Sequence, residues 1–186
     1  MDSQHSLISD DTMPPRSSFS EIRAAQVTVS DPVIFLRDLR AVASAFCTHI
    51  ICFNAERIAG RIHASTAMER SVRAFEAGCM IANTLEMESL LFAAGTRQCS
   101  VAASFGIHEG ENQVYVCCYP ARADVWAPLD SLFHFVPDFP ETMDRKKRDL
   151  LMELFGISGD EIGAAGGEDR LVDLVLERVA LLQVMR

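Results

Sequence analysis

The final helical segment of the chain limits the possible folds more than any other feature. Between Leu171 and Val184 ten of fourteen residues are apolar, and Asp173, Glu177 and Arg178 are three of the four polar ones. A helix that is apolar almost all round is buried on several sides. No apolar run in the chain reaches the roughly 18 residues that a bilayer-spanning helix needs. Two arrangements are therefore open: the rest of the chain wraps around this helix, or a partner protein covers one side of it.

The rest of the sequence alternates between strand and helix patterns. Short β-branched or aromatic runs predict strands, and apolar residues at helical intervals predict helices. This order predicts a mixed α/β (α+β) fold, with a small β-sheet packed against several helices in a single compact domain over residues 21–186. The expected strands span residues 25–29, 49–53 and 113–119, and the expected helices span 32–45, 55–77, 85–94, 98–105, 128–135, 143–155 and 169–184. Residues 156–167 are expected to form a loop or a frayed turn.

Two of the expected helices have recognisable starts. Asp31 followed by Pro32 is typical of a capped helix with proline at its first position. Asn54 is a suitable cap for the helix at 55–77, although Gly60 lowers the helix propensity there by up to ~1 kcal/mol relative to alanine. The apolar side of that helix is expected to contain Ile58, Ile62, Val72, Phe75 and Cys79.

The first 20 residues differ in composition from the rest of the chain. They contain Pro14 and Pro15, several Ser and Asp residues and few large apolar ones, so residues 1–20 are expected to form a disordered tail. They lack the apolar core of a secretory signal. We therefore expect a cytoplasmic protein that makes no contact with a membrane.

Charge and cysteine content narrow the classes of partner. The net charge of −9 opposes nonspecific nucleic-acid binding, because phosphate contacts dominate that affinity. Residues 55–107 carry five acidic and five basic residues, so this part is the least unfavourable to RNA. The six cysteines form no CxxC pair and no zinc-finger spacing, so we expect reduced and mostly buried thiols, with a metal site or redox pair as the alternative. The adjacent Cys117 and Cys118 should point to opposite faces of a strand.

The motifs of well-known catalytic chemistry are missing from the sequence. There is no GxSxG, HExxH, Walker or GxGxxG motif, so we expect no enzymatic activity, no cofactor and no metal. His63 is a weak catalytic candidate, and the alternative is a partly buried or surface histidine. The basic run at residues 145–148 is interpreted as a solvated helix face, with phosphate contact as the alternative.

Three stretches in the middle of the chain resemble a known family. They are RAFEAG at residues 73–78, IANTLEMESLLFAAGTRQ at residues 81–98, and a segment at 102–107 that ends in Phe-Gly-Ile. The sequence resembles the kinase-binding subunit of the KEOPS complex, the family of the TPRKB protein. The resemblance is strongest over residues 49–107 and weaker through 150–155 and 168–184. It departs from the family pattern at Ala94, where Ser is common, and at Cys99, where Ile commonly follows Arg-Gln.

The resemblance implies a function in tRNA modification. It implies a small α/β domain that binds the atypical kinase/ATPase subunit of KEOPS and holds the 3′ CCA tail of tRNA. The catalytic threonylcarbamoyl-transfer subunit would then be an indirect partner. A module that regulates the kinase-like subunit without touching RNA is the alternative. Docking of the kinase-like subunit is expected on the last helix, at Leu171, Leu174, Val175, Leu176, Val179 and Leu182.

The tRNA tail is expected to lie against residues in and beside the family motif. A single-stranded end can be held by a few arginine and amide contacts without a large basic patch. Gly95 permits a close approach of backbone and ligand, Arg97 can fork onto phosphate, and Asn83 and Gln98 can read base edges. Arg73 completes the expected set, and helix capping with surface hydrogen bonding is the alternative for Arg97 and Gln98.

Overall fold

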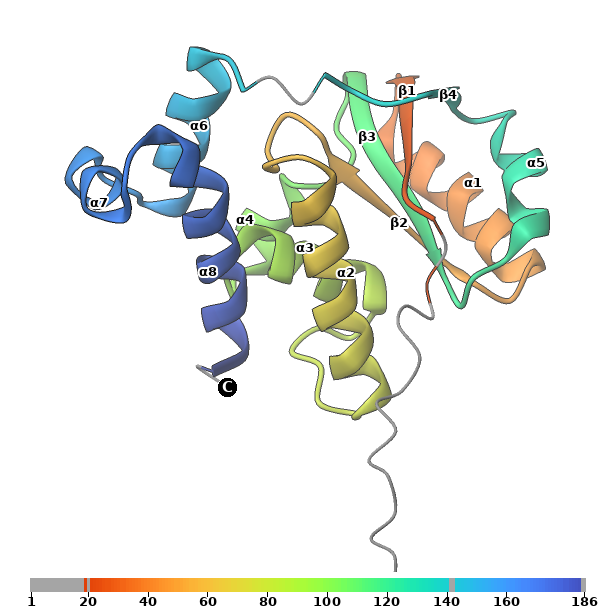
Figure 1. Ribbon diagram of the computed structural model, residues 1–186. Coiled ribbons are helices and arrows are strands. Elements are labelled where there is room, and N and C mark those ends of the chain that lie inside the picture. Colours follow the sequence, from red (N-terminus) through yellow and green to blue (C-terminus); the bar gives the residue numbers. More distant parts are fainter. Residues whose placement is uncertain (1–18, 20, 141–142, 185–186) are drawn as a thin grey trace, which may run out of the picture.

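In the computed structural model, which describes residues 19, 21–140 and 143–184, a four-stranded antiparallel sheet separates two groups of helices (Figure 1). The mixed α/β fold is thus confirmed. The order of the strands is β2-β3-β1-β4, with Ala25 of β1 opposite Val114 of β3 and Ile51 of β2 opposite Cys117 of β3. The predicted disordered tail, residues 1–20, lies outside the described residues apart from Phe19. The strands are β1 (Arg23–Val29), β2 (His49–Asn54), β3 (Gly110–Tyr119) and β4 (His134–Val136).

The helices form layers on both faces of the sheet. In Figure 1, α1 and α5 lie on one face, α2, α3 and α4 on the other, and α6, α7 and α8 form an outer group beyond α2–α4. The bounds of α1 match the prediction, and the Asp31 side chain caps it by accepting the backbone N–H groups of Val33 and Ile34. The helices are α1 (Pro32–Ala45), α2 (Arg61–Glu76), α3 (Leu85–Ala94), α4 (Cys99–Ala103), α5 (Trp126–Leu129), α6 (Arg145–Phe155), α7 (Gly159–Ala165) and α8 (Leu171–Val184), with the short 3-10 turns η1 (Ala123–Val125) and η2 (Glu168–Arg170).

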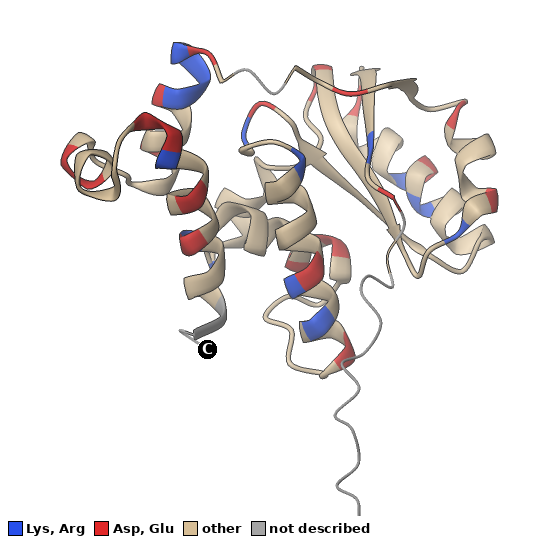
Figure 2. Ribbon diagram, in the orientation of Figure 1, with Lys and Arg blue, Asp and Glu red and all other residues tan. Residues whose placement is uncertain are grey.

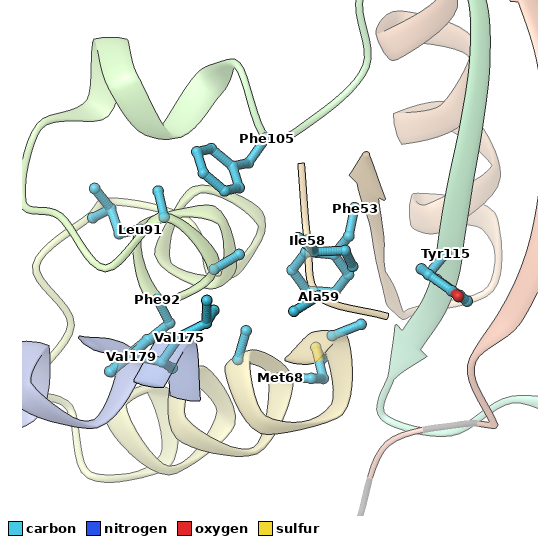
Figure 3. Packing of buried hydrophobic residues seen from close by; sticks show 14 of the residues in the cluster. Phe53, Ile58, Ala59, Met68, Leu91, Phe92, Phe105, Tyr115, Val175 and Val179 are labelled. Atoms are coloured by element: carbon cyan, nitrogen blue, oxygen red, sulfur yellow. The ribbon is translucent and has the colours of Figure 1, made fainter. Parts of the chain in front are cut away.

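Alternating strand residues supply two separate hydrophobic cores. On β2, Ile51 and Phe53 belong to the core under α2, α3 and α4, which extends to α6, α7 and α8, whereas Ile50 and Cys52 belong to the core under α1 and α5. This follows from the two-residue period of a strand. The larger core draws Phe53 of β2, Met68 of α2, Phe92 of α3 and Val175 of α8 into one cluster (Figure 3). The sheet therefore supports α2 and α3, and these helices in turn support α8.

The structure corrects the helix predicted at residues 55–77. It begins at Arg61, because Gly60 adopts a φ of 84°, and the Asn54 side chain instead accepts the N–H of Glu56 in the preceding turn. Ile62 and Phe75, expected on its apolar side, are exposed, as is Cys79 beyond its end. The buried side contains His63, Ala64, Ala67, Met68, Ser71, Val72 and Ala74, so small residues mark the close contact with the neighbouring helix.

Two predictions in the second half of the chain are wrong. Residues 128–135 do not form a helix, because α5 ends at Leu129 and β4, which pairs with β1, begins at His134. Residues 156–167 do not form a loop, because they contain α7, which Ser158 caps through the N–H of Glu161. The glycines in this segment have a low helix propensity, so the sequence did not predict that short helix.

The cysteines are free thiols, as expected, but only half of them are buried. Cys117 and Cys118 belong to the cores on opposite faces of the sheet, which confirms their predicted directions. Burial raises the pKa of the Cys52 thiol to about 12. Cys47, Cys79 and Cys99 are exposed, contrary to expectation. Within the described part of the chain, no three His, Cys, Asp or Glu side chains are placed to hold a metal ion.

As for membranes, none of the helices in the described ranges combines the length and apolarity that spanning would require.

Candidate protein and RNA contact surfaces

The inner side of α8 belongs to the core of this chain. It contacts α2, α3 and α6, and Figure 3 shows Val175 and Val179 turned toward Phe92 of α3. Five of the six residues predicted for docking are buried here, which removes them from any surface that a partner can reach while α8 stays in place. They are Leu171, Leu174, Val175, Val179 and Leu182.

The outer side of α8 keeps an apolar strip that the chain itself covers only in part. Val172, Leu176 and Ala180 are half-buried and follow one another at four-residue intervals, so they lie along one side of the helix. Leu181, which is 47% exposed, lies on another side of the helix, one turn after the exposed Glu177. Leu176 is thus the one residue of the predicted docking set that remains accessible. Leu181 was missed because hydrophobicity alone does not separate the two sides of an almost wholly apolar helix.

An ion pair ties α8 to α7. The Arg178 guanidinium donates to Glu161 Oε1 at 2.6 Å, and both side chains are about one-third exposed. The pair holds α7 beside the buried half of α8, and the outer strip is left on the other side of the helix. The sequence did not indicate this contact because residues 156–167 were read as a loop.

The residues predicted for the tRNA tail do not form one cluster. Asn83 precedes the first turn of α3, whereas Gly95, Arg97 and Gln98 follow its last turn. Ten residues of helix, about 15 Å in length, separate the two groups. Arg73 lies in the last turn of α2 and is exposed, as are Asn83, Arg97 and Gln98. Only the group at 95–98 is compact enough to hold one nucleotide.

Gln98 lies at the start of α4 without capping it through its side chain. It occupies the N-cap position, and its backbone carbonyl accepts the N–H of Ala102 at 3.0 Å, but its side chain makes no capping hydrogen bond. Thr96 makes the local side-chain bond instead, because its hydroxyl accepts the N–H of Gln98. The Gln98 amide is therefore not committed to capping the helix.

The structure explains why position 95 is a glycine, which the sequence did not reveal. It ends α3 in the left-handed conformation, with a φ of 59°. A Cβ at this position would lie 3.5 Å from the backbone of Arg178 on α8. The close approach that was predicted for a ligand is therefore made by a helix of the same chain.

The basic run at the start of α6 is largely occupied by internal contacts. Arg145 lies 3.7 Å from Asp149, and Arg148 pairs with Glu168. Lys147 donates to the carbonyl of Ala55 at 3.0 Å, and burial lowers the pKa of this lysine.

Acidic residues outnumber basic ones around the groove beside this run. Its volume is about 820 Å³, and Figure 2 shows acidic segments close to the basic start of α6. Three basic and four acidic residues line the groove, and this balance disfavours the binding of a phosphate group. They are Arg145, Lys146 and Lys147 against Glu56, Asp144, Asp149 and Glu153.

His63 is a structural residue of α2. Its Nδ1 accepts the N–H of Ala59 at 3.0 Å, its Nε2 donates to the carbonyl of Ala93 at 2.9 Å, and its ring meets Phe155 edge to face. The side chain is fully buried, and burial lowers its pKa to about 4. A neutral imidazole with both nitrogens bonded inside the core has no free site for a substrate proton.

Glu88, the acidic residue at the centre of the family motif, holds the segment that leads into α3. It is fully buried, and its Oε2 accepts the backbone N–H groups of Ile81 and Ala82, each at 2.8 Å. These bonds fix the course of the chain between α2 and α3. A carboxylate that accepts two backbone donors makes charge-assisted hydrogen bonds, which are stronger than neutral ones.

We expect Glu88→Ala to lower the free energy of unfolding by about 2–4 kcal/mol, because it removes two charge-assisted bonds and leaves their donors unpaired. Urea denaturation measures the loss. The matched control is Glu69→Ala on the exposed side of α2, which should change stability by less than about 0.5 kcal/mol. Equal stability of the two variants would show that Glu88 does not hold this segment.

Comparison with known proteins gives one match. A family model described as kinase binding protein CGI-121 matches residues 35–183, a range that runs from α1 through nearly all of α8. No protein with curated annotation matches the sequence.

Proposed function

This chain belongs to the CGI-121 family of kinase-binding proteins, and we propose that it is a noncatalytic subunit of the KEOPS complex. In this function it binds the atypical kinase/ATPase subunit and helps to recruit tRNA, through the 3′ CCA tail, for threonylcarbamoylation of adenosine. The threonylcarbamoyl-transfer reaction takes place on another subunit, and the protein acts in the cytoplasm.

The observation that carries the kinase-binding function is the family match over residues 35–183. The structure offers a surface for it on the outer side of α8. Val172, Leu176 and Ala180 form an apolar strip beside the exposed Glu177, and interface centres are typically apolar with a polar rim. The docking surface is therefore centred on Leu176, while the inner residues of α8 hold the helix in place.

Residues 95–98 support recruitment of the tRNA tail. Arg97 and Gln98 are exposed between α3 and α4, and residues 55–107 carry no net charge in a chain whose total is −9. A guanidinium can bind a phosphate, and an amide can pair with a base edge. Gly95 places this segment against the backbone of α8, so the tail site and the docking strip are carried by contacting elements.

A second function, regulation of the kinase-like subunit without RNA contact, is favoured by the separation of the predicted tail residues. Asn83 and Arg97 lie at opposite ends of α3, and Arg145–Arg148 sits beside a groove with more acids than bases. A gel shift of tRNA with and without its CCA end distinguishes the two functions. The absence of a shift with either RNA would favour regulation, whereas equal shifts would mean that RNA is bound elsewhere than at its CCA end.

We expect Arg97→Ala to weaken tRNA binding by about ten- to hundredfold, the effect of losing a phosphate or base contact worth about 1–3 kcal/mol. Kinase docking should be unchanged. The measurement is fluorescence anisotropy of labelled tRNA with the full chain bound to its kinase-like partner. Arg37→Ala, an equally simple loss of an exposed arginine on α1, is the control and should bind as the wild type does. Removal of CCA should make the wild type and Arg97→Ala alike, and a persistent difference would place Arg97 outside the tail site.

A further inference from the structure

A pocket outside the surfaces described above opens at the end of the sheet where β2 begins and β3 ends. Its volume is about 320 Å³, which lies within the usual range for small-ligand sites. The turn after α1 forms one side, and the Thr48 hydroxyl holds the strand ends together by donating to the carbonyl of Pro120 at 2.8 Å. The principal lining residues are Ser44, Cys47, His49, Phe75, Tyr119 and Pro120.

Three rings from three different elements form a wall of this pocket. Phe75 of α2 lies between His49 of β2 and Tyr119 of β3, with ring centroids 5.5 Å and 5.9 Å apart and interplanar angles of 70° and 78°. Phe75 is 37% exposed, and His49 and Tyr119 are half-buried. The cluster is thus built from well-packed rings, yet it remains open to solvent. Phe53 and Phe92, by contrast, are almost wholly buried in the core.

Each outer ring of the wall is bonded to a carboxylate. The Tyr119 hydroxyl donates to Glu76 Oε1 at 2.7 Å, and His49 Nδ1 lies 2.8 Å from Glu86 Oε1. Glu76 ends α2 and Glu86 belongs to the first turn of α3, so two helices place negative charge on the two sides of Phe75. The described residues that line the pocket include no Lys, Arg, Asp or Glu, so Glu76 and Glu86 act from just beyond its lining, where they bond two of its rings.

Aromatic faces beside carboxylates suit a flat cation. A guanidinium stacks on aromatic rings with its apolar face and donates in its plane to carboxylate oxygens. A phosphate group would be repelled by Glu76 and Glu86, and a wholly apolar side chain would gain no attraction from their charge. We propose that this pocket binds the side chain of an arginine carried by a partner protein. The site is independent of Leu176 and Arg97, and it adds a second point of protein contact.

The proposal can be tested with a short peptide and its neutral counterpart. The probes are acetyl-Gly-Arg-Gly-amide and the same peptide with citrulline, which keeps the shape of arginine but loses its charge. Binding is followed by amide chemical shifts of the ¹⁵N-labelled full chain, read at Cys47, His49 and Tyr119. We expect saturable shifts with the arginine peptide and at least tenfold weaker binding of the citrulline peptide.

Variants of the pocket separate a built site from a general attraction of cations to an acidic protein. Glu86→Gln should weaken the arginine peptide about fivefold or more, and Phe75→Ala should do the same by removing the ring between the carboxylates. Glu177→Gln, which removes an exposed carboxylate on α8, is the matched control and should have no effect. Equal binding of the two peptides, or equal loss in Glu86→Gln and Glu177→Gln, would overturn the proposal. Glu86→Gln alters a 39%-exposed side chain, so the test does not depend on whether Phe75→Ala folds.

Discussion

Replacing Leu176 with arginine should abolish association with the kinase-like subunit while the chain stays folded. Leu176 is only half-buried within this chain, and it lies at the centre of the apolar strip on α8. A charge placed in the centre of an interface is left unpaired and poorly solvated, and the few residues that dominate binding, each worth about 2 kcal/mol or more, cluster near that centre. The expected loss of affinity is about a hundredfold or more.

Pull-down with the purified kinase-like subunit, followed by calorimetric titration, measures this loss, and circular dichroism checks the fold. Val33→Arg is the matched control, because Val33 is an apolar residue that is 77% exposed on α1, across the sheet from α8. It should bind as the wild type does. Ala180→Arg, one turn further along the strip and also half-buried, provides the test if Leu176→Arg unfolds. A folded strip variant with undiminished affinity would place the docking surface elsewhere.

The two sides of α8 show how much of this surface could be predicted from the sequence. The apolar pattern correctly indicated a helix buried on several sides, and α2, α3 and α6 do cover it. It did not indicate which residues face outward, because Leu174 and Leu176 are chemically identical and differ only in where the other helices lie. An exposed fraction of only 7% at Leu174, against partial exposure at Leu176, is a property of the assembled layers.

Local signals predicted the fold best where a cap and an apolar pattern agreed. Asp31 with Pro32 marked the start of α1, and the predicted bounds of the helix at 85–94 match α3, which Thr84 and Gly95 cap. The prediction failed where tertiary pairing decided the structure. β4 has three residues and exists because it pairs with β1, whereas α7 is held by its contact with α8 through Glu161. Neither contact has a signature within its own segment.

For the candidate sites too, patterns within one segment were recognised, whereas contacts between distant segments were not. The motif around Glu88 was correctly seen as distinctive, but its buried carboxylate stabilises the chain between α2 and α3. The pocket at His49, Phe75 and Tyr119 was not foreseen, because its three rings are up to 70 residues apart in the sequence and meet only through the pairing of β2 with β3 and the packing of α2. Phe75 had been expected on the apolar side of its helix, because helical spacing within one segment does not show what the other segments cover.

Acidification should destabilise the protein through His63. Burial lowers the pKa of this side chain from 6.5 to about 4, while the unfolded chain keeps the ordinary value. Between these two values the unfolded state binds the proton and the folded state does not, so the free energy of unfolding falls as the pH falls. The stability that neutral His63 contributes is fully present above pH 6.5 and is lost by pH 4. The loss is about 2 kcal/mol by pH 5 and about 3 kcal/mol in all.

The effect can be separated from the titration of the acidic residues by comparing variants. His63→Gln keeps a donor and an acceptor in the core but cannot gain a proton in this range. The stability difference between wild type and His63→Gln, measured by urea denaturation, should therefore shrink by about 2 kcal/mol from pH 7.5 to pH 5. Ser71→Ala is the control, since Ser71 is also buried and hydrogen-bonded but does not titrate, and its difference from wild type should stay constant. A His63→Gln difference that is equally constant would mean that the imidazole takes up a proton as easily in the folded chain as in the unfolded one, which its two core hydrogen bonds and its contact with Phe155 should prevent.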